Sequence, residues 1–367
     1  MFLYSLIRGL NRVGICAEHN FLISSEKYRE WSYGYRRIIM RFLAYFVYPL
    51  FLAFSCVFYR RGSVFIVTTN PFFAPLVAIL CANKSKSVIH LVWDIFPEAL
   101  IVSGRISERS FLTKILRMNA NYIFRKSKAN VFIGEELSRY VSTKIPNSAE
   151  NFVIPVGCDA EPFERSPPKI IIPGQSIQLL YCGNVGLMHD IDTLLKVIIS
   201  PVLFGQLNPD ICFRFNAYGP LYEIFKREIR FRGHLQIPFQ LILEGSLSND
   251  DWVECMKICQ VAIVTMLPGA EHVVVPSKTY SALAAGQAIL AICPLDSDLA
   301  RLVLENDCGW VIEPGDSQYL VDILNIISFD YALLHQKRIN AFRVGQAKYS
   351  ELCIANDWAK LIGIVTK

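Results

Sequence analysis

The chain alternates short apolar runs, rich in β-branched residues, with longer stretches in which apolar positions recur every three or four residues. The short runs predict β-strands. They lie at residues 64–68, 88–92, 130–133, 152–156, 177–182, 212–217, 240–243, 261–265 and 288–292. The longer stretches predict helices, and strands that alternate with helices at this spacing are typical of parallel sheets covered by helices. We therefore predict an α/β fold.

A proline-rich stretch at residues 166–174 divides this alternation into two blocks. The 367 residues are enough for two domains of roughly 150 to 180 residues each. We predict two doubly wound, Rossmann-like domains that face an interdomain cleft, at residues 1–165 and 175–345. A C-terminal helix at residues 346–367 could pack back on the first domain.

The first residues already follow a helical period, with apolar side chains at Leu3, Leu6, Ile7, Leu10 and Val13. A doubly wound domain normally begins with a strand, so we expect that its first strand has been lost here. A shortened chain, a mis-assigned start and genuine divergence all stay open as explanations. The opening segment has neither the basic leader nor the long apolar core of a secretory signal, so secretion is not expected.

One segment of the first block is unusually apolar. Residues 42–59 contain no charge over 18 positions, with Pro49 near the middle. Arginines flank the segment on both sides, at Arg36, Arg37, Arg41, Arg60 and Arg61. Three interpretations stay open: a helix lying in the membrane interface, a buried core helix, and a single membrane span. The strand predicted directly afterwards, at residues 63–68, argues against a span.

Charge is distributed unevenly along the chain. Residues 1–165 hold 21 lysines and arginines against 12 acidic residues, although the net charge of the whole chain is only +5. A basic first domain suggests an anionic partner, and arginines beside apolar residues favour lipid headgroups over nucleic acid. We predict a peripheral, monotopic protein on the cytoplasmic face of a membrane. A second basic group, between residues 105 and 128, could add to this attraction or form a solvated helical face.

The eleven cysteines are scattered through apolar segments with irregular spacing. Such cysteines are typical of free buried thiols in a reducing compartment, which favours the cytoplasm. Cys255 and Cys259 lie four positions apart, but no second cysteine or histidine pair completes a zinc site. We predict no metal site.

Glycine- and proline-rich loops follow several of the predicted strands. They are Gly183–Gly186, Tyr218–Pro220 and Pro268–Glu271 in the second domain, and Asp94 has the equivalent place in the first. In open parallel sheets, ligands bind beyond the carboxyl ends of the strands. Two such edges facing each other would form the cleft between the domains, where small-molecule sites commonly lie.

The sharpest local signal is the segment Pro276–Gly286. Ser277 is predicted to cap a short helix and Gly286 to end it, which puts Lys278 in the first turn. A cation there opposes the helix dipole by roughly 0.3 to 1 kcal/mol, unless an anion binds at the same helix end. A phosphate would fit, and a surface lysine with a flexible stem is the alternative.

These motifs together resemble glycosyltransferase family 4. The resemblance rests on Cys182–Asp190 followed by Thr193–Leu195, on the Pro-Ser-Lys segment at 276–286 and on Cys308–Asp316, and in the first domain on Asp94, Pro97 and Glu98 and on 154–159. It covers the chain from about residue 63 to the end. It implies the GT-B fold and a retaining, metal-independent transfer of a sugar from a UDP- or GDP-sugar, with no cofactor. The second domain would bind the donor and the first the acceptor.

The resemblance also assigns residues. Lys278 would stabilise the diphosphate together with the amides of Gly183 to Gly186, and Asp94 would orient the acceptor or act as base unless it is only a helix cap. The donor-binding candidates are Gly183, Asn184, Gly186, His189, Gly219, Glu271, Pro276, Ser277, Tyr280 and Ser281. His189 could equally be a turn residue. Because the first domain is apolar and basic, we expect a lipid-linked or oligosaccharide acceptor in surface polysaccharide synthesis.

Several departures from the family pattern matter. Many members carry an arginine and a lysine near the first loop of the donor domain, where this chain has Asn184, His189 and Asp190. Val273 and Ser281 stand where many members carry glutamates, and Trp93 stands where a histidine often precedes the aspartate. An inactive GT-B partner subunit, which binds a nucleotide sugar or another glycosyltransferase, therefore stays open as the alternative. A nicotinamide dehydrogenase is disfavoured because no Gly-x-Gly-x-x-Gly follows a strand.

Overall fold

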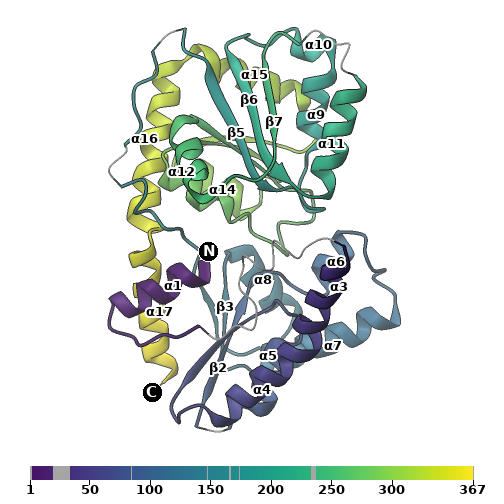
Figure 1. Cartoon of the computed structure of the whole chain (residues 1–367), viewed down its shortest axis with the longest axis vertical. Coiled ribbons are helices and arrows are strands. Elements are labelled where there is room, and N and C mark those ends of the chain that lie inside the picture. The colour runs from purple at the N-terminus through teal and green to yellow at the C-terminus, as the bar shows by residue number, and fades with distance from the viewer. Residues whose placement is uncertain are drawn as a thin grey trace.

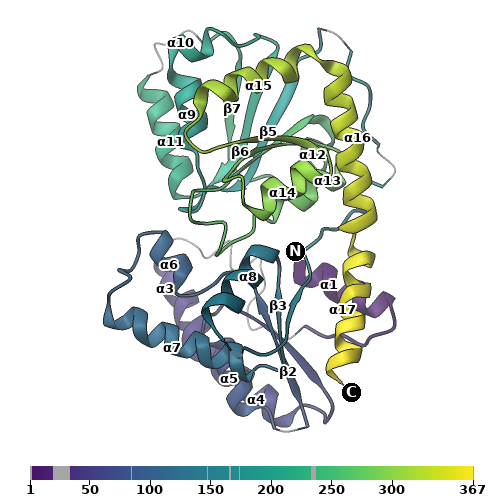
Figure 2. The ribbon, with the colours of Figure 1, turned by 180° about the vertical axis from the view of Figure 1, so that it is seen from behind.

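The structure is a computed structural model that describes residues 2–19, 34–83, 85–146, 148–164, 167–172, 174–232 and 237–366. Two α/β lobes lie one above the other, and the last helices run along one side of both (Figures 1 and 2). All nine predicted strands are present. The prediction does not include a tenth strand, Gly309–Ile312, which lies within the Cys308–Asp316 motif.

The first lobe is built from a four-stranded parallel sheet and its helices. Its elements are α1 (Phe2–Arg12), α3 (Gly34–Phe42), the π-helix η1 (Leu43–Val47), α4 (Tyr48–Phe58), β1 (Val64–Thr68), α5 (Ala74–Cys81), β2 (Ser87–Val92), α6 (Glu98–Val102), α7 (Phe111–Lys126), β3 (Ala129–Phe132), α8 (Glu135–Lys144) and β4 (Asn151–Val153). The second lobe has a six-stranded parallel sheet. Its elements are β5 (Ile177–Asn184), α9 (Asp192–Ile199), α10 (Pro201–Phe204), β6 (Ile211–Tyr218), α11 (Pro220–Phe231), β7 (Gln240–Glu244), α12 (Asn249–Ile258), β8 (Val261–Thr265), α13 (Lys278–Ala284), β9 (Ala288–Ile292), α14 (Asp298–Glu305), β10 (Gly309–Ile312), α15 (Ser317–Phe329) and α16 (Tyr331–Lys348). The last helix is α17 (Glu351–Val365).

The two sheets are wound differently. In the second sheet the order is β10-β9-β8-β5-β6-β7, so the chain reverses direction at β5, as in a doubly wound domain. In the first sheet the described strands follow in chain order, β1-β2-β3-β4. The reversal typical of double winding is therefore seen among the described strands of the second sheet, and the strand order of the first sheet is simpler. Since parallel crossovers are almost always right-handed, winding in one direction puts the crossover helices on one face of the sheet.

Helices from the two ends of the chain cover the other face of the first sheet. Trp358 and Leu361 of α17 and Leu10 of α1 are buried in one cluster with Ile89 and Leu91 of β2. The alternate residues of β2 face the crossover helices: Val88 packs with α5, and the ring of His90 lies 5.0 Å from that of Phe124 in α7. The C-terminal helix thus supplies a layer that the crossovers cannot form.

An ion-pair network fastens α17 to α1. The carboxylate of Glu351, at the start of α17, accepts hydrogen bonds from Arg8, with the guanidinium Nε at 2.8 and 2.9 Å. Arg8 also pairs with Asp159, and these two acidic partners raise its pKa further above its ordinary value. At Gly9 an added Cβ would lie only 2.8 Å from the Cβ of Ala355, so the two helices are in close contact.

In the second domain, α13 packs tightly against α16. An added Cβ at Gly345 of α16 would lie 2.6 Å from the backbone nitrogen of Ala284 and from the carbonyl carbon of Leu283. These are backbone atoms of α13, so they cannot rotate away. Gly345 is therefore required for the approach of the two helices.

We expect Gly345→Ala to lower the free energy of unfolding by about 1 to 3 kcal/mol, because the methyl group must push α16 away from α13. Gly363→Ala in α17 is the matched control, since nothing lies within 4 Å of its added Cβ. That variant should be neutral or up to about 1 kcal/mol more stable, because alanine is the better helix former. Urea unfolding of both variants measures the difference. Equal effects would contradict the assigned contact.

Candidate functional site

A cleft of about 940 Å³ lies between the two domains. Residues that follow β2 form its wall on the first domain, and residues that follow β5 and β8 form its wall on the second. β5 and β8 are the neighbours at which the second sheet reverses. Outside the carboxyl ends of such strands the loops diverge and leave a crevice, which is where open α/β sheets bind ligands.

Lys278 lies at this reversal point and connects the β8 side of the sheet to the end of β5. It follows the loop after β8, and its ammonium donates a hydrogen bond across to the carbonyl oxygen of Asn184, the last residue of β5, at 3.3 Å. The ammonium also lies 4.0 Å from the ring centre of Tyr181, within range of a cation–π contact. Desolvation lowers the pKa of Lys278 to about 7. No carboxylate among the described residues forms an ion pair with it, so the cleft wall carries an unbalanced cation.

His189 lies beside this lysine. Its Nδ1 is 3.1 Å from the amide nitrogen of Gly186, and burial, together with the charge of Lys278, lowers its pKa to about 4. The ring is therefore neutral at physiological pH. A neutral histidine with one nitrogen used in the turn offers its other nitrogen to a ligand, so the turn and the ligand roles are compatible.

The expectation that the amides of Gly183 to Gly186 would cradle a diphosphate is wrong for half of that segment. The amide of Val185 donates to the carbonyl oxygen of Tyr218 at 2.7 Å, and that of Gly186 faces His189. Gly219 does not line the cleft either. With φ of 114°, it allows close approach of the two loops, since an added Cβ would lie 2.4 Å from Oδ1 of Asn184.

Asp94 lies on the opposite wall, just beyond the end of β2. The hydroxyl oxygen of Thr69 accepts hydrogen bonds from the amides of Trp93 and Asp94, at 3.2 and 3.4 Å, which fixes the backbone there. Burial raises the pKa of Asp94 to about 6. Its carboxylate has no hydrogen bond to another described residue, and the cap position of the next helix is Pro97. The interpretation of Asp94 as a helix cap is therefore wrong.

Most of the predicted site residues line the same cleft. They are Asp94, Gly183, Asn184, Gly186, His189, Pro276, Ser277, Lys278 and Ser281. Tyr280 does not: its ring is buried and packs at a tilt against that of Tyr349, with the ring centres 4.9 Å apart, so it is a core residue. Ser277 has the N-cap position of α13, but its side chain makes no capping hydrogen bond. Glu271 lies outside the lining residues and faces His272 instead, with Nε2 at 3.6 Å from its carboxylate.

The chain is similar to a probable glycosyltransferase and to several solved structures. No family model matches it. A probable glycosyltransferase of Pseudomonas aeruginosa, WbjE, is 27% identical over 290 residues, which are 73% of this chain and 66% of that protein. The sucrose-phosphate synthase of Thermosynechococcus elongatus has a similar structure, with a TM-score of 0.67 and 14% identity over 99% of this chain and 92% of that one. Anabaena HepE in complex with UDP gives a TM-score of 0.62 and 14% identity, over 82% and 79%.

The chain has the GT-B fold. The likeness to the solved structures extends over both lobes of that fold, whereas the likeness to WbjE covers just under two thirds of that protein.

A second cavity, of about 310 Å³, continues the cleft of this GT-B fold into the second domain. It lies between the ends of β5 and β6 and helix α12, and it shares Gly183, Tyr218, Trp252, Lys278 and Ser281 with the cleft. The sequence prediction missed Trp252. Ser248 caps α12 by accepting from the amide of Asp251, and the indole one residue further on reaches the cavity. The loop after β7 also follows a predicted strand, so the rule that ligands bind beyond the carboxyl ends of strands applies to it as well.

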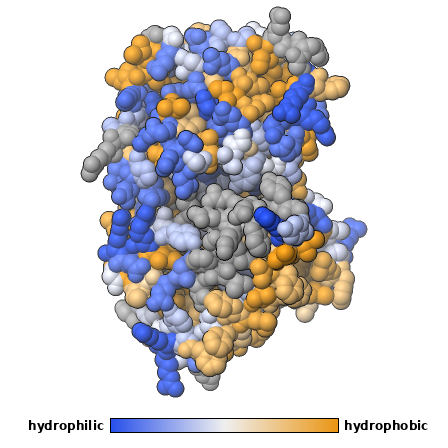
Figure 3. Space-filling view, viewed as in Figure 1, coloured by the Kyte–Doolittle hydropathy of each residue, from blue (hydrophilic) through white to orange (hydrophobic). Residues whose placement is uncertain are grey.

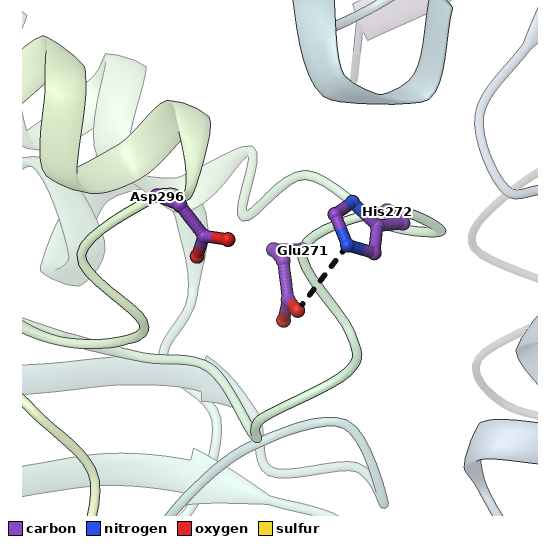
Figure 4. Close-up of side chains that lie close together, drawn as sticks. All are labelled: Glu271, His272 and Asp296. Carbon is purple, nitrogen blue, oxygen red and sulfur yellow. Dashed lines mark ion pairs between the residues drawn. The ribbon is translucent and has the colours of Figure 1, made fainter. Parts of the chain in front are cut away.

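Glu271, His272 and Asp296 are the one group in the described parts of the chain that could hold a metal ion (Figure 4). Nε2 of His272 lies 3.6 Å from the carboxylate of Glu271. Ligand atoms around one small ion lie about 3 Å apart, so these side chains would have to move closer together to bind it. Nδ1 of His272 also lies 3.9 Å from Glu136 of the first domain. Arg301 pairs with the same carboxylate, so this corner is a contact between the domains.

Proposed function

We propose that this chain is a glycosyltransferase that moves a sugar from a nucleotide-diphosphate donor to an acceptor hydroxyl. The observation that carries the proposal is Lys278, an unbalanced cation at the strand reversal of the second domain. An anion bound there would restore the charge balance that burial has disturbed. The likeness to a probable glycosyltransferase and to a structure holding UDP supports the same chemistry.

The donor would be a UDP-sugar that occupies both cavities. The smaller one, with Trp252 and Tyr218, suits a nucleoside, because aromatic faces stack on a base and exclude water. The diphosphate would lie at Lys278, and the sugar would extend into the cleft toward Asp94. Ser281 lines both cavities and could donate a hydrogen bond to the ribose.

The reaction would proceed with retention of configuration and without a metal ion. The bond between the anomeric carbon and the diphosphate oxygen breaks as the acceptor oxygen attacks from the same face. The leaving phosphate oxygens take the acceptor proton, or Asp94 takes it as base. The protein supplies positive potential at Lys278 and position, which is a preorganised electrostatic role. The ammonium would stabilise the departing charge that a metal ion stabilises in other transferases.

The acceptor would be a sugar carried on a membrane lipid, such as a polyprenyl diphosphate, in the synthesis of a surface polysaccharide on the cytoplasmic side. Exposed apolar residues of the first domain support this assignment. An inactive partner subunit stays the second candidate. It is favoured by one observation: among the described residues that line the two cavities, none from the second domain is an aspartate or glutamate.

We expect Lys278→Ala to weaken binding of UDP about 10- to 100-fold, since a charge-assisted hydrogen bond contributes about 1.5 to 3 kcal/mol. The free amine, with a pKa of about 7, is mostly neutral at pH 8, and a bound diphosphate would favour its charged form. Binding at pH 8 should therefore take up a proton, and affinity should fall as pH rises above 7. Titration calorimetry in two buffers of different ionisation enthalpy measures both effects.

Lys226→Ala is the matched control for that titration. Its ammonium also lies over a tyrosine ring, 4.8 Å from the centre of Tyr222, but it lines neither cavity. UDP binding should be unchanged. Unchanged binding in Lys278→Ala as well would contradict the donor site.

We expect kcat/KM to depend on pH with a narrow maximum between about 6 and 7. Asp94 acts as a carboxylate, and its raised pKa means that activity is lost as pH falls through about 6. Lys278 acts as an ammonium, so activity is lost as pH rises through about 7. Asp94→Asn should remove the acid limb and lower kcat about 10²- to 10⁴-fold. If the activity of this variant still falls at low pH, the role assigned to Asp94 as a carboxylate base is wrong.

The products decide the reaction type. We expect the new glycosidic bond to keep the anomeric configuration of the donor, as measured by NMR, and the rate to survive EDTA. A lipid-linked acceptor should react faster than a short soluble one. Inversion, or loss of activity in EDTA that magnesium restores, would overturn the corresponding part of the proposal. Donor binding without any transfer, across a panel of acceptors, would favour the partner subunit.

A further inference from the structure

The first domain exposes a long apolar ridge. Helices α3, η1 and α4 form one continuous helix over residues 34–58, which runs across the front of the lower lobe in Figure 1. Phe46, Leu50, Phe54 and Phe58 recur at every fourth position and are between 61% and 73% exposed. Side chains four apart share one face of a helix, so the four form a single stripe. An apolar patch lies over this helix in Figure 3.

This helix is long and apolar enough to cross a membrane, with 21 residues from Ile38 to Phe58, yet only 17% of its most apolar window is buried. Its C-terminal half is fixed to the domain. Leu52 and Cys56 pack against Ala78 of α5, and the ammonium of Lys86 donates to the last carbonyls of α4, those of Cys56 and Val57, at 2.7 and 2.8 Å. A membrane span would have to break these contacts. The helix can meet a bilayer only with its exposed stripe.

A second apolar stripe lies on α7. Phe111, Ile115, Met118 and Tyr122 are exposed, while the other side of α7 is buried through Ala120, Ile123 and Phe124. Both α4 and α7 pack against α5, whose Leu80 is exposed as well. We call the exposed stripes of the 34–58 helix and of α7, with Leu80, the apolar face.

The two helices that carry the apolar face bear charges of one sign only, although Arg117 of α7 pairs with Glu98 and Glu108 from neighbouring segments. No aspartate or glutamate occurs in residues 34–58 or in α7. Basic residues at its margins are exposed: Arg41, Arg60, Arg61, Arg109, Lys114 and Lys126. Exposed phenylalanines bordered by lysine and arginine are the composition of helices that lie in the headgroup region of anionic membranes. A protein partner would have to match the same combination, whereas an anionic bilayer matches it without any specific fit.

A short segment of chain joins the cleft to the second stripe, because α6 and the loop after it line the cleft and lead to α7. Leu100 of α6 lines the cleft, as do Ser103 and Arg105 in the loop that leads to α7. Arg105 is exposed, and no ion pair joins it to another described residue. It is the cleft-lining cation nearest in sequence to the second stripe.

We propose that the apolar face lies flat on an anionic bilayer, with the 34–58 helix parallel to the surface, and that the cleft opens toward the headgroups at Arg105. Membrane contact follows from the apolar face alone. The passage of a phosphate-bearing lipid acceptor past Arg105 rests on the proposed function.

Vesicle sedimentation tests the contact. We expect the full chain to bind vesicles of phosphatidylglycerol and phosphatidylcholine, and to bind them at least tenfold more weakly in 0.5 M salt, because each basic residue near the surface contributes about 1 kcal/mol. Phe46→Glu and Met118→Glu, one on each stripe, should each weaken binding about tenfold or more. Phe329→Glu is the matched control, since Phe329 is 71% exposed but lies on α15 of the second domain. UDP affinity of all three variants should equal that of the parent protein.

The depth of two positions tests the orientation. Phe46→Trp and Val57→Trp place an indole near either end of the exposed side, since the two positions are 11 residues, and therefore about 16 Å, apart along the helix but only about 20° apart around it. With brominated lipids, a helix parallel to the surface should give both indoles the same shallow depth. Unequal depths would show a tilted or spanning helix and overturn the proposal.

Other outcomes would overturn it as well. Absence of vesicle binding, or binding that Phe46→Glu leaves unchanged, rejects the apolar face as a membrane surface. A dimer in light scattering that Phe46→Glu converts to a monomer assigns the face to a second copy of the chain. If vesicles bind as expected but UDP does not, the surface stands and the proposed function fails. Arg105→Ala should raise KM for a lipid-linked acceptor several-fold without changing UDP affinity.

Discussion

The close packing of α13 against α16 at Gly345 is the contact on which the rest of the site depends. Helix α13 has seven residues and no side-chain cap, so it cannot be stable by itself. Its backbone touches α16 where Gly345 leaves room, and its first residue is Lys278. The same run of chain continues from α16 into α17, which completes the core of the first domain through Trp358. One pair of helices therefore supports the cation of the second domain and the sheet whose β2 ends just before Asp94.

The ionisable groups of the molecule divide into two kinds. Glu136 and Glu351 are buried, but arginines pair with each of them, so their charges are satisfied within the fold. Lys278 and Asp94 have no such partners among the described residues, and burial moves their pKa values toward neutrality, down to about 7 and up to about 6. Burying an ionisable group without a partner costs free energy. A folded protein keeps such a group where a ligand supplies the opposite charge or where a proton is transferred. The two groups lie on facing walls of one cleft.

The sequence predicted the strands well and the details of the site less well, for physical reasons. A buried strand can be recognised from its own run of apolar β-branched residues. Asp94 followed from its place after such a strand, and Lys278 from its place in the first turn of a short helix. Tyr280 was misassigned because its position next to Lys278 says nothing about its direction, which the packing on Tyr349 decides. The amides of Val185 and Gly186 were predicted to be free, but Tyr218 and His189 engage them from loops whose approach depends on Gly219. Such tertiary contacts leave no local pattern in the sequence.

The winding of the first sheet also determines which surface is left for a membrane. Because the strands follow in chain order, their crossover helices lie on one face, and α1 and α17 cover the other. The covered face carries the Arg8–Glu351 network and the connection to the second domain, so it cannot also turn toward lipid. The 34–58 helix packs outside the crossover helices, on α5, with its own outer side exposed. A reversed strand order would have placed crossover helices on both faces of the sheet. Here the crossover helices lie on one face, and the apolar residues that the core does not accommodate are exposed on that side.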